Sequence, residues 1–201
     1  MKDILRKSIT GHVLIRDIDS GTVLVDKFNA INYENFSIAL AQTLGNRPDS
    51  WIQNMAFGNG AATVSGTGQV TYLQPNVVGT SAKLYNETYF KCVNDLSPFN
   101  LDPTKNYITT AHASGTTYSD IIITCNLGIS EPAGQEAFDN ATSLSGNYVF
   151  NELGLKAFNT VDAANNNDAT GMLLTHVIFS PVQKSLNRQL EIVYTIRIQT
   201  V

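Results

Sequence analysis

Four closely spaced glycines, Gly58, Gly60, Gly66 and Gly68, have the composition of a loop that could cradle a phosphate group. Phosphate-binding loops place such glycines at the start of a helix, because the helix N-terminus faces the anion. Here the glycines lead into residues 69–73, a β-like run, and no Lys-Ser/Thr pair completes a P-loop. We therefore predict a flexible connection between strands and no nucleotide cofactor.

The three histidines are the next candidates for chemistry. His12, His112 and His176 lie far apart in the sequence, and none has a second ligand at a metal-binding spacing. Strand histidines are therefore favoured over a zinc site. Asp162 and Asp168 flank an Asn run, but the glycine and the terminal glutamate of a calcium loop are missing. We predict no bound metal.

Paired carboxylates could act as a general acid and base, and Glu131, Glu136 and Asp139 are close in sequence. Their neighbours Pro132 and Gly134 instead indicate a solvated loop. A Gly-x-Ser-x-Gly nucleophile motif does not occur. The residues therefore predict a protein that is not an enzyme and that holds no cofactor.

Cys92 and Cys125 lie inside apparent strands and have no Cys-x-x-Cys spacing. Buried thiols are the favoured interpretation, and a disulfide between them remains open.

The composition limits the remaining function classes. The length of 201 residues suits a single domain, 1–201. The net charge is −4 and the sequence has no cluster of basic residues, which disfavours nucleic-acid binding. Charged residues make up only 15%, against about 25% in typical domains. A surface with so few charges favours a protein surrounded by partners. No apolar run is long enough to span a membrane, and no secretory signal is recognised, so we expect synthesis in the cytoplasm without secretion.

The elements that must position these residues are mainly strands. Two β-rich runs, 12–17 and 22–26, flank an Asp-Ser-Gly turn and predict a hairpin. Period-two patterns and turn residues predict further strands at 52–57, 69–73, 87–93, 106–113, 118–127, 147–158, 172–179 and 189–200. About nine such strands predict a mainly β fold, an antiparallel β-sandwich with a jelly-roll-like arrangement.

One amphipathic helix is predicted near residues 33–44. Asn32 is placed to cap its start and Gly45 to end it. The apolar residues Tyr33, Phe36, Leu40 and Leu44 recur at steps of three and four, so we expect them to pack one face of the helix against the sheet.

Two segments are expected to leave the core. Residues 58–86 form a long, glycine-rich and almost uncharged stretch, longer than most loops inside a compact domain. We predict an intermolecular arm there, in which Val70, Tyr72 and Leu73 add a strand to a neighbouring sheet. Residues 159–171 are mostly polar and include a run of asparagines, so we predict that they form a polar tip.

Three stretches of the sequence carry a resemblance to a known group of proteins. They are residues 11–35, residues 55–68 with their glycines, and the Phe-Asn-Glu-Leu-Gly-Leu segment 150–155 followed by 173–182 and the last strand. This order is similar to that of virion structural proteins of tailed bacteriophages. The resemblance implies a β-sandwich built into a particle.

The resemblance implies a structural, non-enzymatic virion subunit, an oligomeric head, neck (collar) or decoration component. Its partners would be other virion proteins and copies of itself, without direct contact to nucleic acid or membrane. The alternative is a tail, baseplate or fibre-base protein that binds a carbohydrate or receptor. Stacking platforms for that alternative would come from Trp51, Tyr72, Tyr85, Tyr89 and Tyr118.

Overall fold

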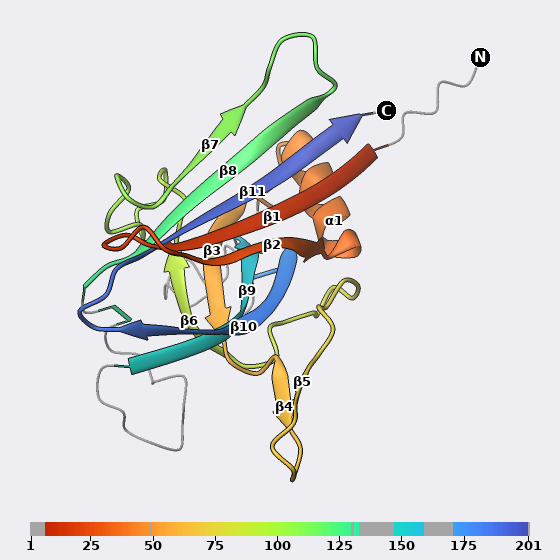
Figure 1. Ribbon diagram of the computed structural model, residues 1–201. Coiled ribbons are helices and arrows are strands. Elements are labelled where there is room, and N and C mark those ends of the chain that lie inside the picture. Colours follow the sequence, from red (N-terminus) through yellow and green to blue (C-terminus); the bar gives the residue numbers. More distant parts are fainter. Residues whose placement is uncertain (1–6, 49, 130, 133–146, 159–170, 201) are drawn as a thin grey trace.

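A computed structural model describes residues 7–48, 50–129, 131–132, 147–158 and 171–200 of the chain (Figure 1). Most of the predicted polar tip, 159–171, lies outside the described residues. The elements in chain order are β1 (Lys7–Asp17), β2 (Val23–Ile31), α1 (Tyr33–Leu44), β3 (Ile52–Gly58), β4 (Ala62–Val64), β5 (Val70–Tyr72), β6 (Glu87–Cys92), β7 (Tyr107–Ala111), β8 (Tyr118–Leu127), β9 (Asn147–Ala157), β10 (Thr175–Ser185) and β11 (Leu190–Thr200).

Nine of these strands form one antiparallel sheet in the order β6-β3-β9-β10-β2-β1-β11-β8-β7, and β4 pairs with β5 alone. The sheet curls, so that strands from its two ends come together. Lys91 of β6 donates a hydrogen bond from Nζ to the carbonyl of Asn126 in β8, at 2.7 Å. The prediction of a mainly β, antiparallel, sandwich-like fold with about nine strands and one helix is confirmed.

The core lies inside the curl and follows the period-two pattern of the strands. In β11 the side chains of Leu190, Ile192, Tyr194 and Ile196 are fully buried. Their alternation places one face of the strand in the core and the other toward solvent. The predicted hairpin of β1 and β2 also forms, and Gly21 adopts a positive φ of 71° in its turn.

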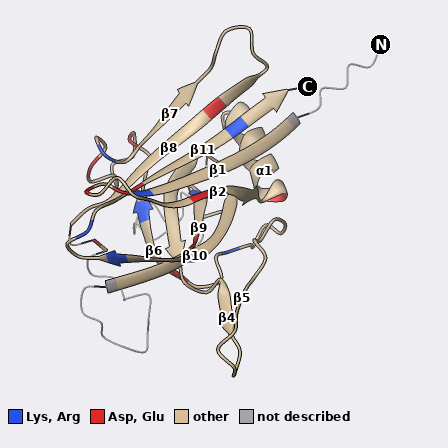
Figure 2. Cartoon of the chain, viewed as in Figure 1, with Lys and Arg blue, Asp and Glu red and all other residues tan. Residues whose placement is uncertain are grey.

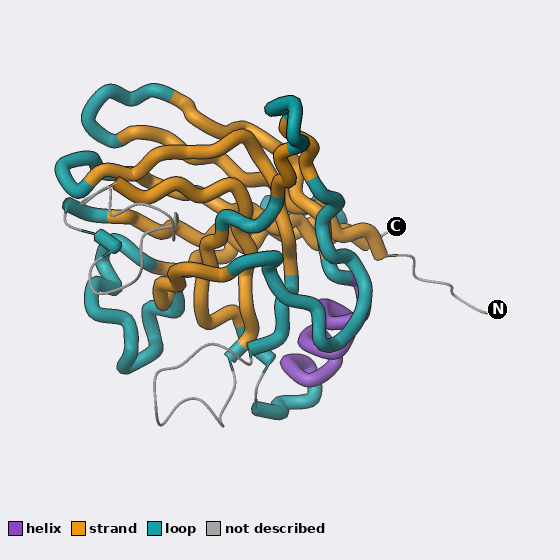
Figure 3. The backbone as a smooth tube through the Cα atoms, turned by 90° about the horizontal axis from the view of Figure 1, so that it is seen from below, coloured by secondary structure: helices purple, strands orange, loops and turns teal. Residues whose placement is uncertain are grey.

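Helix α1 lies against one side of the sheet (Figure 3). Its ends are as predicted: the Asn32 side chain accepts a hydrogen bond from the backbone N–H of Asn35 at 3.0 Å, and Gly45 is the C-cap.

The packing face of α1 differs from the predicted one. The buried residues are Asn35, Phe36 and Ala39, whereas Tyr33 and Leu44 are 66% and 76% exposed. Of the four residues expected on that face, Phe36 is buried and Leu40 is half-buried. The buried face of the helix is therefore rotated away from the predicted apolar face, and only Phe36 is buried and belongs to both.

Because proline has no N–H to donate, Pro181 would be expected to end strand pairing after residue 179, but it does not. Strand β10 continues to Ser185, and its pairing with β9 shifts register between Ile178 and Val182. Because a bulge leaves residues outside the hydrogen-bonded ladder, it accommodates a proline that cannot donate.

Candidate functional site

The β4–β5 hairpin, residues 62–72, projects from the body of the molecule (Figure 1). Its pairs are Ala62 with Tyr72, Thr63 with Thr71 and Val64 with Val70. The hairpin carries no Lys, Arg, Asp or Glu (Figure 2). At its base the N–H of Leu73 donates to the carbonyl of Ala61 at 2.9 Å, so the two ends of the hairpin are adjacent.

One side of this hairpin is apolar and open to solvent. Paired residues point to the same side of a two-stranded sheet, and the sides alternate along each strand. Ala62, Val64, Val70 and Tyr72 therefore share one side, which we call the hairpin face. Val64 is 67% exposed and Val70 is 50% exposed. The opposite side carries the polar side chains of the paired threonines.

The four glycines of the predicted arm lie at two different places, the turn of the hairpin and its root. Gly66 and Gly68 lie in the turn of the hairpin, where Gly68 has a φ of 81°. Gly58 and Gly60 lie at its root, against the chain at Asn86. A Cβ on Gly58 would be 2.4 Å from the Asn86 carbonyl oxygen, and one on Gly60 would be 2.6 Å from the Asn86 nitrogen. The root glycines thus permit a close approach of two backbone segments.

The rest of the predicted arm lies on the body. The N–H of Tyr33 donates to the carbonyl of Val77 at 3.0 Å, and the N–H of Gly79 donates to the Glu34 carboxylate at 3.0 Å. Leu84 is buried. The part that projects is therefore the hairpin, which is shorter than the 58–86 segment singled out in the sequence.

A buried carboxylate holds the hairpin root. Glu152 of β9 is fully buried and accepts hydrogen bonds from the backbone N–H groups of Gly60 at 3.0 Å, Tyr85 at 2.9 Å and Asn86 at 2.8 Å. Burial would raise the pKa of this carboxyl, but the hydrogen bonds from His176 and these N–H groups outweigh burial and hold its pKa below the usual value.

His176 of β10 completes this root cluster, which consists of Glu152, His176 and the three N–H groups. Its Nε2 lies 3.0 Å from a Glu152 oxygen, and its Nδ1 accepts the N–H of Asn76 at 2.9 Å. Since Nδ1 accepts, Nε2 carries the proton and donates to Glu152. Both nitrogens and both carboxylate oxygens are engaged by the protein itself, so the pair acts as a structural tie.

The root cluster joins the stretches that carry the resemblance. Glu152 belongs to segment 150–155, His176 to segment 173–182 and Gly60 to segment 55–68. In the first of these, Gly154 lies where a Cβ would be 2.6 Å from the carbonyl oxygen of Thr175. The missing side chain of Gly154 therefore permits a close approach of two backbone segments.

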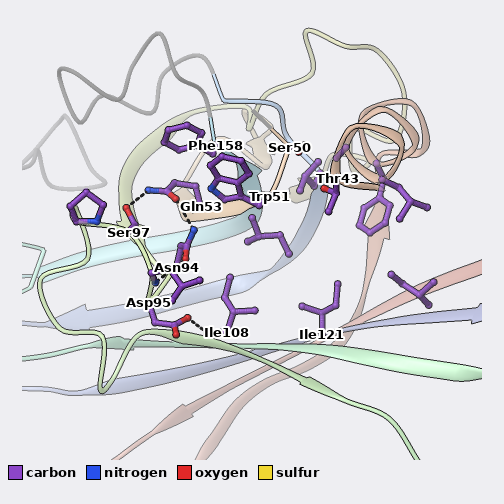
Figure 4. Close-up of a pocket in the computed structure, with 18 residues that line it drawn as sticks. Thr43, Ser50, Trp51, Gln53, Asn94, Asp95, Ser97, Ile108, Ile121 and Phe158 are labelled. Carbon is purple, nitrogen blue, oxygen red and sulfur yellow. Dashed lines mark hydrogen bonds between the residues drawn. The ribbon is translucent and has the colours of Figure 1, made fainter. Parts of the chain in front are cut away.

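At the other end of β3 the protein contains a cavity of about 650 Å³ (Figure 4). It lies between α1, the start of β3 and the strands β7, β8 and β11. Its apolar lining includes Phe36, Leu40, Ile108, Ile121 and Ile198. The volume and the apolar character are those of ligand-binding cavities, which range from about 300 to 1,000 Å³.

An aromatic pair forms one wall of the cavity. Trp51 and Phe158 stack with ring centroids 4.8 Å apart and planes at 14°. Trp51 is 41% exposed and is the only tryptophan of the chain.

Three polar residues at the cavity, Gln53, Asn94 and Ser97, form hydrogen bonds with one another. Gln53 donates from Nε2 to Ser97 Oγ at 2.7 Å and accepts from Asn94 Nδ2 at 3.2 Å (Figure 4). Asp95, the single charged residue that the described part of the chain contributes to the lining, accepts the N–H of Ile108 at 3.1 Å. A molecule bound in the cavity would therefore contact it mainly through apolar surface.

The remaining candidates for chemistry stay apart from this cavity and from one another. His12 contacts Asp26 at the surface, and His112 bonds to the carbonyl of Tyr118. Among the residues that the structure describes, no three His, Cys, Asp or Glu side chains gather as a metal ion would require. Glu131 forms a salt bridge with Lys91 at 2.6 Å. The other carboxylates weighed above, at positions 136, 139, 162 and 168, lie outside the described residues.

Cys92 and Cys125 are both buried thiols, as the sequence favoured. Burial raises the pKa of Cys125 to about 12. Of the aromatic residues considered as stacking platforms, Trp51, Tyr72 and Tyr85 are each about two-fifths exposed, whereas Tyr89 is buried in the core.

Comparison of the chain with protein-family models, with curated proteins and with solved structures finds no match. Within the described part of the chain, no helix has the length and apolar character needed to cross a membrane.

Sequence reasoning missed the root cluster and the cavity. Glu152 and His176 were present in the quoted segments, but only as parts of a pattern. The usable signal was a glutamate within a run whose neighbours are all apolar or amide-bearing, because such a charge is buried only with partners. The cavity has no comparable signal, since its lining comes from elements distant in the sequence.

Proposed function

We propose that this chain is a structural, non-enzymatic subunit of a virion of the tailed-phage type. In this role it is an oligomeric head, neck (collar) or decoration component, located in the particle and made in the host cytoplasm. It binds other virion proteins and copies of itself. The observation that carries the proposal is a projecting, uncharged hairpin with a solvent-exposed apolar face.

The way in which the hairpin is anchored supports a role in binding. Glu152 fixes the backbone at Gly60 and at the Tyr85–Asn86 step, so the hairpin leaves the body from a rigid base. A rigid base lowers the entropy lost when the hairpin is ordered by a partner. Exposed apolar surface on a projection with a fixed base is typical of a protein–protein contact.

Other exposed apolar residues extend this argument. Leu96 and Leu101 are almost fully exposed, and Phe28 is 76% exposed. Together with a charged content of 15%, they describe a surface better suited to contact with neighbours than to free solution.

The test is incorporation into particles. Density-gradient purification of particles from cells that make this chain should recover it in a fixed ratio to the other structural proteins, and salt should not remove it. A chain that stays at the top of the gradient while complete particles sediment contradicts the proposal.

The alternative is a tail, baseplate or fibre-base protein with carbohydrate- or receptor-binding capacity. The exposed Trp51 at the cavity favours it, because aromatic faces stack on sugar rings. Glycan panels should then shift the melting temperature of the wild type and quench Trp51 fluorescence, and Trp51→Ala should abolish the melting-temperature shift. An unchanged melting temperature with every glycan argues against this alternative.

A further inference from the structure

We propose that the hairpin face of one copy binds in the apolar cavity of the next copy, so that the chain associates head to tail. This inference rests on the proposed structural function and names the partner of the hairpin, a second copy of the chain.

The outer part of the hairpin face, Val64 and Val70, is open to solvent. Tyr72, at the base of the face, instead borders a pocket that Phe28 and Phe179 of the same copy also line. Strands β4 and β5 pair only with each other, and an isolated two-stranded hairpin is marginally stable in water. Val64 and Val70 stand side by side on this face, and both are at least half exposed. Burying such a face against apolar surface is favourable, by roughly 25 cal/mol for each Å² removed from water.

The cavity is suited to an apolar and uncharged occupant, and the hairpin face has both properties. Its lining is mainly apolar, and the amides of Gln53 and Asn94 are already bonded within the wall. Among the described residues no Lys or Arg lines it, so these residues offer an acidic ligand no counter-charge, and the carboxylate of Asp95 repels one. Apolar side chains without charge satisfy these conditions, and the hairpin face supplies them.

Strand β3 places the two features at opposite ends. Ile52 and Gln53, at the start of β3, line the cavity, and Gly58, at its end, lies at the hairpin root. A strand of seven residues is about 20 Å long. The hairpin also points away from the body (Figure 1), so it reaches the cavity of another copy and not its own. Such a contact joins two different surfaces, which generates a ring or an open filament.

The first test places charge on the hairpin. Val64→Glu with Val70→Glu puts two carboxylates on the hairpin face, and the matched control, Thr63→Glu with Thr71→Glu, puts them on the polar side. Sedimentation of the wild type over a range of concentrations should show oligomers that persist at high salt, because the contact is uncharged. The hairpin-face variant should weaken association by more than about tenfold, and the control should associate as the wild type does.

The second test places charge in the cavity. Leu40→Glu introduces a carboxylate into the lining, and Leu44→Glu, one turn further along α1, introduces it at an exposed position outside the lining. Only Leu40→Glu should weaken association. Urea unfolding of each variant checks that the fold is retained.

Mixing the two defective variants distinguishes a head-to-tail contact from a symmetric one. The hairpin-face variant keeps an intact cavity, and the cavity variant keeps an intact hairpin, so the mixture should form a heterodimer and stop there. With Trp51→Phe in the cavity variant, the remaining Trp51 reports on the occupied cavity, and its emission should shift to shorter wavelength on mixing.

Each outcome separates the inference from the proposed function. A wild type that stays monomeric at millimolar concentration, or that associates unchanged in both charged variants, overturns the inference. If the chain nevertheless enters particles, the structural function stands without it. Head-to-tail association of a chain that never enters particles supports the inference and contradicts the proposed function.

Discussion

The substitution Glu152→Gln should destabilise the protein far more than its small change in shape suggests. The carboxylate accepts from four donors: three backbone N–H groups and Nε2–H of His176. An amide keeps one oxygen and replaces the other with an NH₂ group. Whichever way the amide is turned, two of the four donors then face its NH₂ group, which cannot accept a hydrogen bond from them.

The size of the effect follows from this count. Each buried donor left unsatisfied costs about 1–3 kcal/mol, so two cost about 2–6 kcal/mol. His176 does not relieve the conflict by changing tautomer, because its Nδ1 accepts the N–H of Asn76. In a chain of this length, such a loss lowers the melting temperature by at least about 4 °C.

The matched control is Glu34→Gln. Glu34 also accepts a backbone N–H of the 58–86 segment, that of Gly79, but at an exposed position where water serves a displaced group. Its cost should stay below about 1 kcal/mol. Urea unfolding followed by circular dichroism measures both variants, and amide hydrogen exchange should accelerate at Gly60, Tyr85 and Asn86 only in Glu152→Gln.

The same residue gives a pH dependence with a definite sign. Because the pKa of Glu152 is lowered in the folded protein, its stabilising contribution is complete above the unfolded pKa of about 4.3 and is lost as the pH falls through the lower folded pKa. The acid-induced loss of stability should therefore be smaller in Glu152→Gln. Equal unfolding free energies for wild type and variant at neutral pH would refute the role assigned to the carboxylate.

Three further substitutions test other parts of the structure. Gly154→Ala should cost about 1–3 kcal/mol in urea unfolding, because the added Cβ meets a backbone carbonyl oxygen, whereas Gly66→Ala, with open space around it, should be nearly neutral. Phe36→Ala should cost about 3 kcal/mol or more and Leu44→Ala close to zero, which thermal unfolding compares directly. Burial lowers the pKa of Lys184 to about 8, so stability should rise from pH 8 toward pH 10, and Lys184→Met should lose that rise in pH-dependent unfolding.

The strands could be predicted from the sequence because their core positions repeat every second residue. In β11 this repeat alone locates the buried side chains. The short strand β4 was missed, since Ala62–Val64 is three residues long and its partner lies beyond a glycine-rich turn. Periodicity needs more residues than that to be recognised.

The helix shows why a correct element can be assigned a wrong face. Hydrophobic spacing selected Tyr33 and Leu44, yet the buried side includes Asn35, whose amide donates to the carbonyl of Leu173 at 2.9 Å. A buried and bonded asparagine counts as polar in any hydrophobic pattern. The buried face thus includes a polar residue whose partner lies 138 positions away in the sequence.

The candidate site was predicted in part for a related reason. The unusual composition of residues 58–86 pointed to the hairpin, because glycines and missing charges are visible in the sequence itself. The hairpin is anchored by Glu152 and His176, which lie on the paired strands β9 and β10, far from the hairpin in the sequence. Contacts of this kind are a property of the topology.

The order of strands also has a consequence for how the chain folds. The first described strand, β1, pairs with the last, β11, and β3 pairs with β9, nearly one hundred residues later. Sheets dominated by such distant pairings fold slowly, because the entropy of closing a long loop is lost before the stabilising contacts can form. During synthesis one edge of β3 stays unpaired until β9 is made, and one edge of β1 stays unpaired until β11 is made, so both edges are open to other chains until then. The nine-stranded sheet can therefore be completed only after β11, the last described strand, has been synthesised.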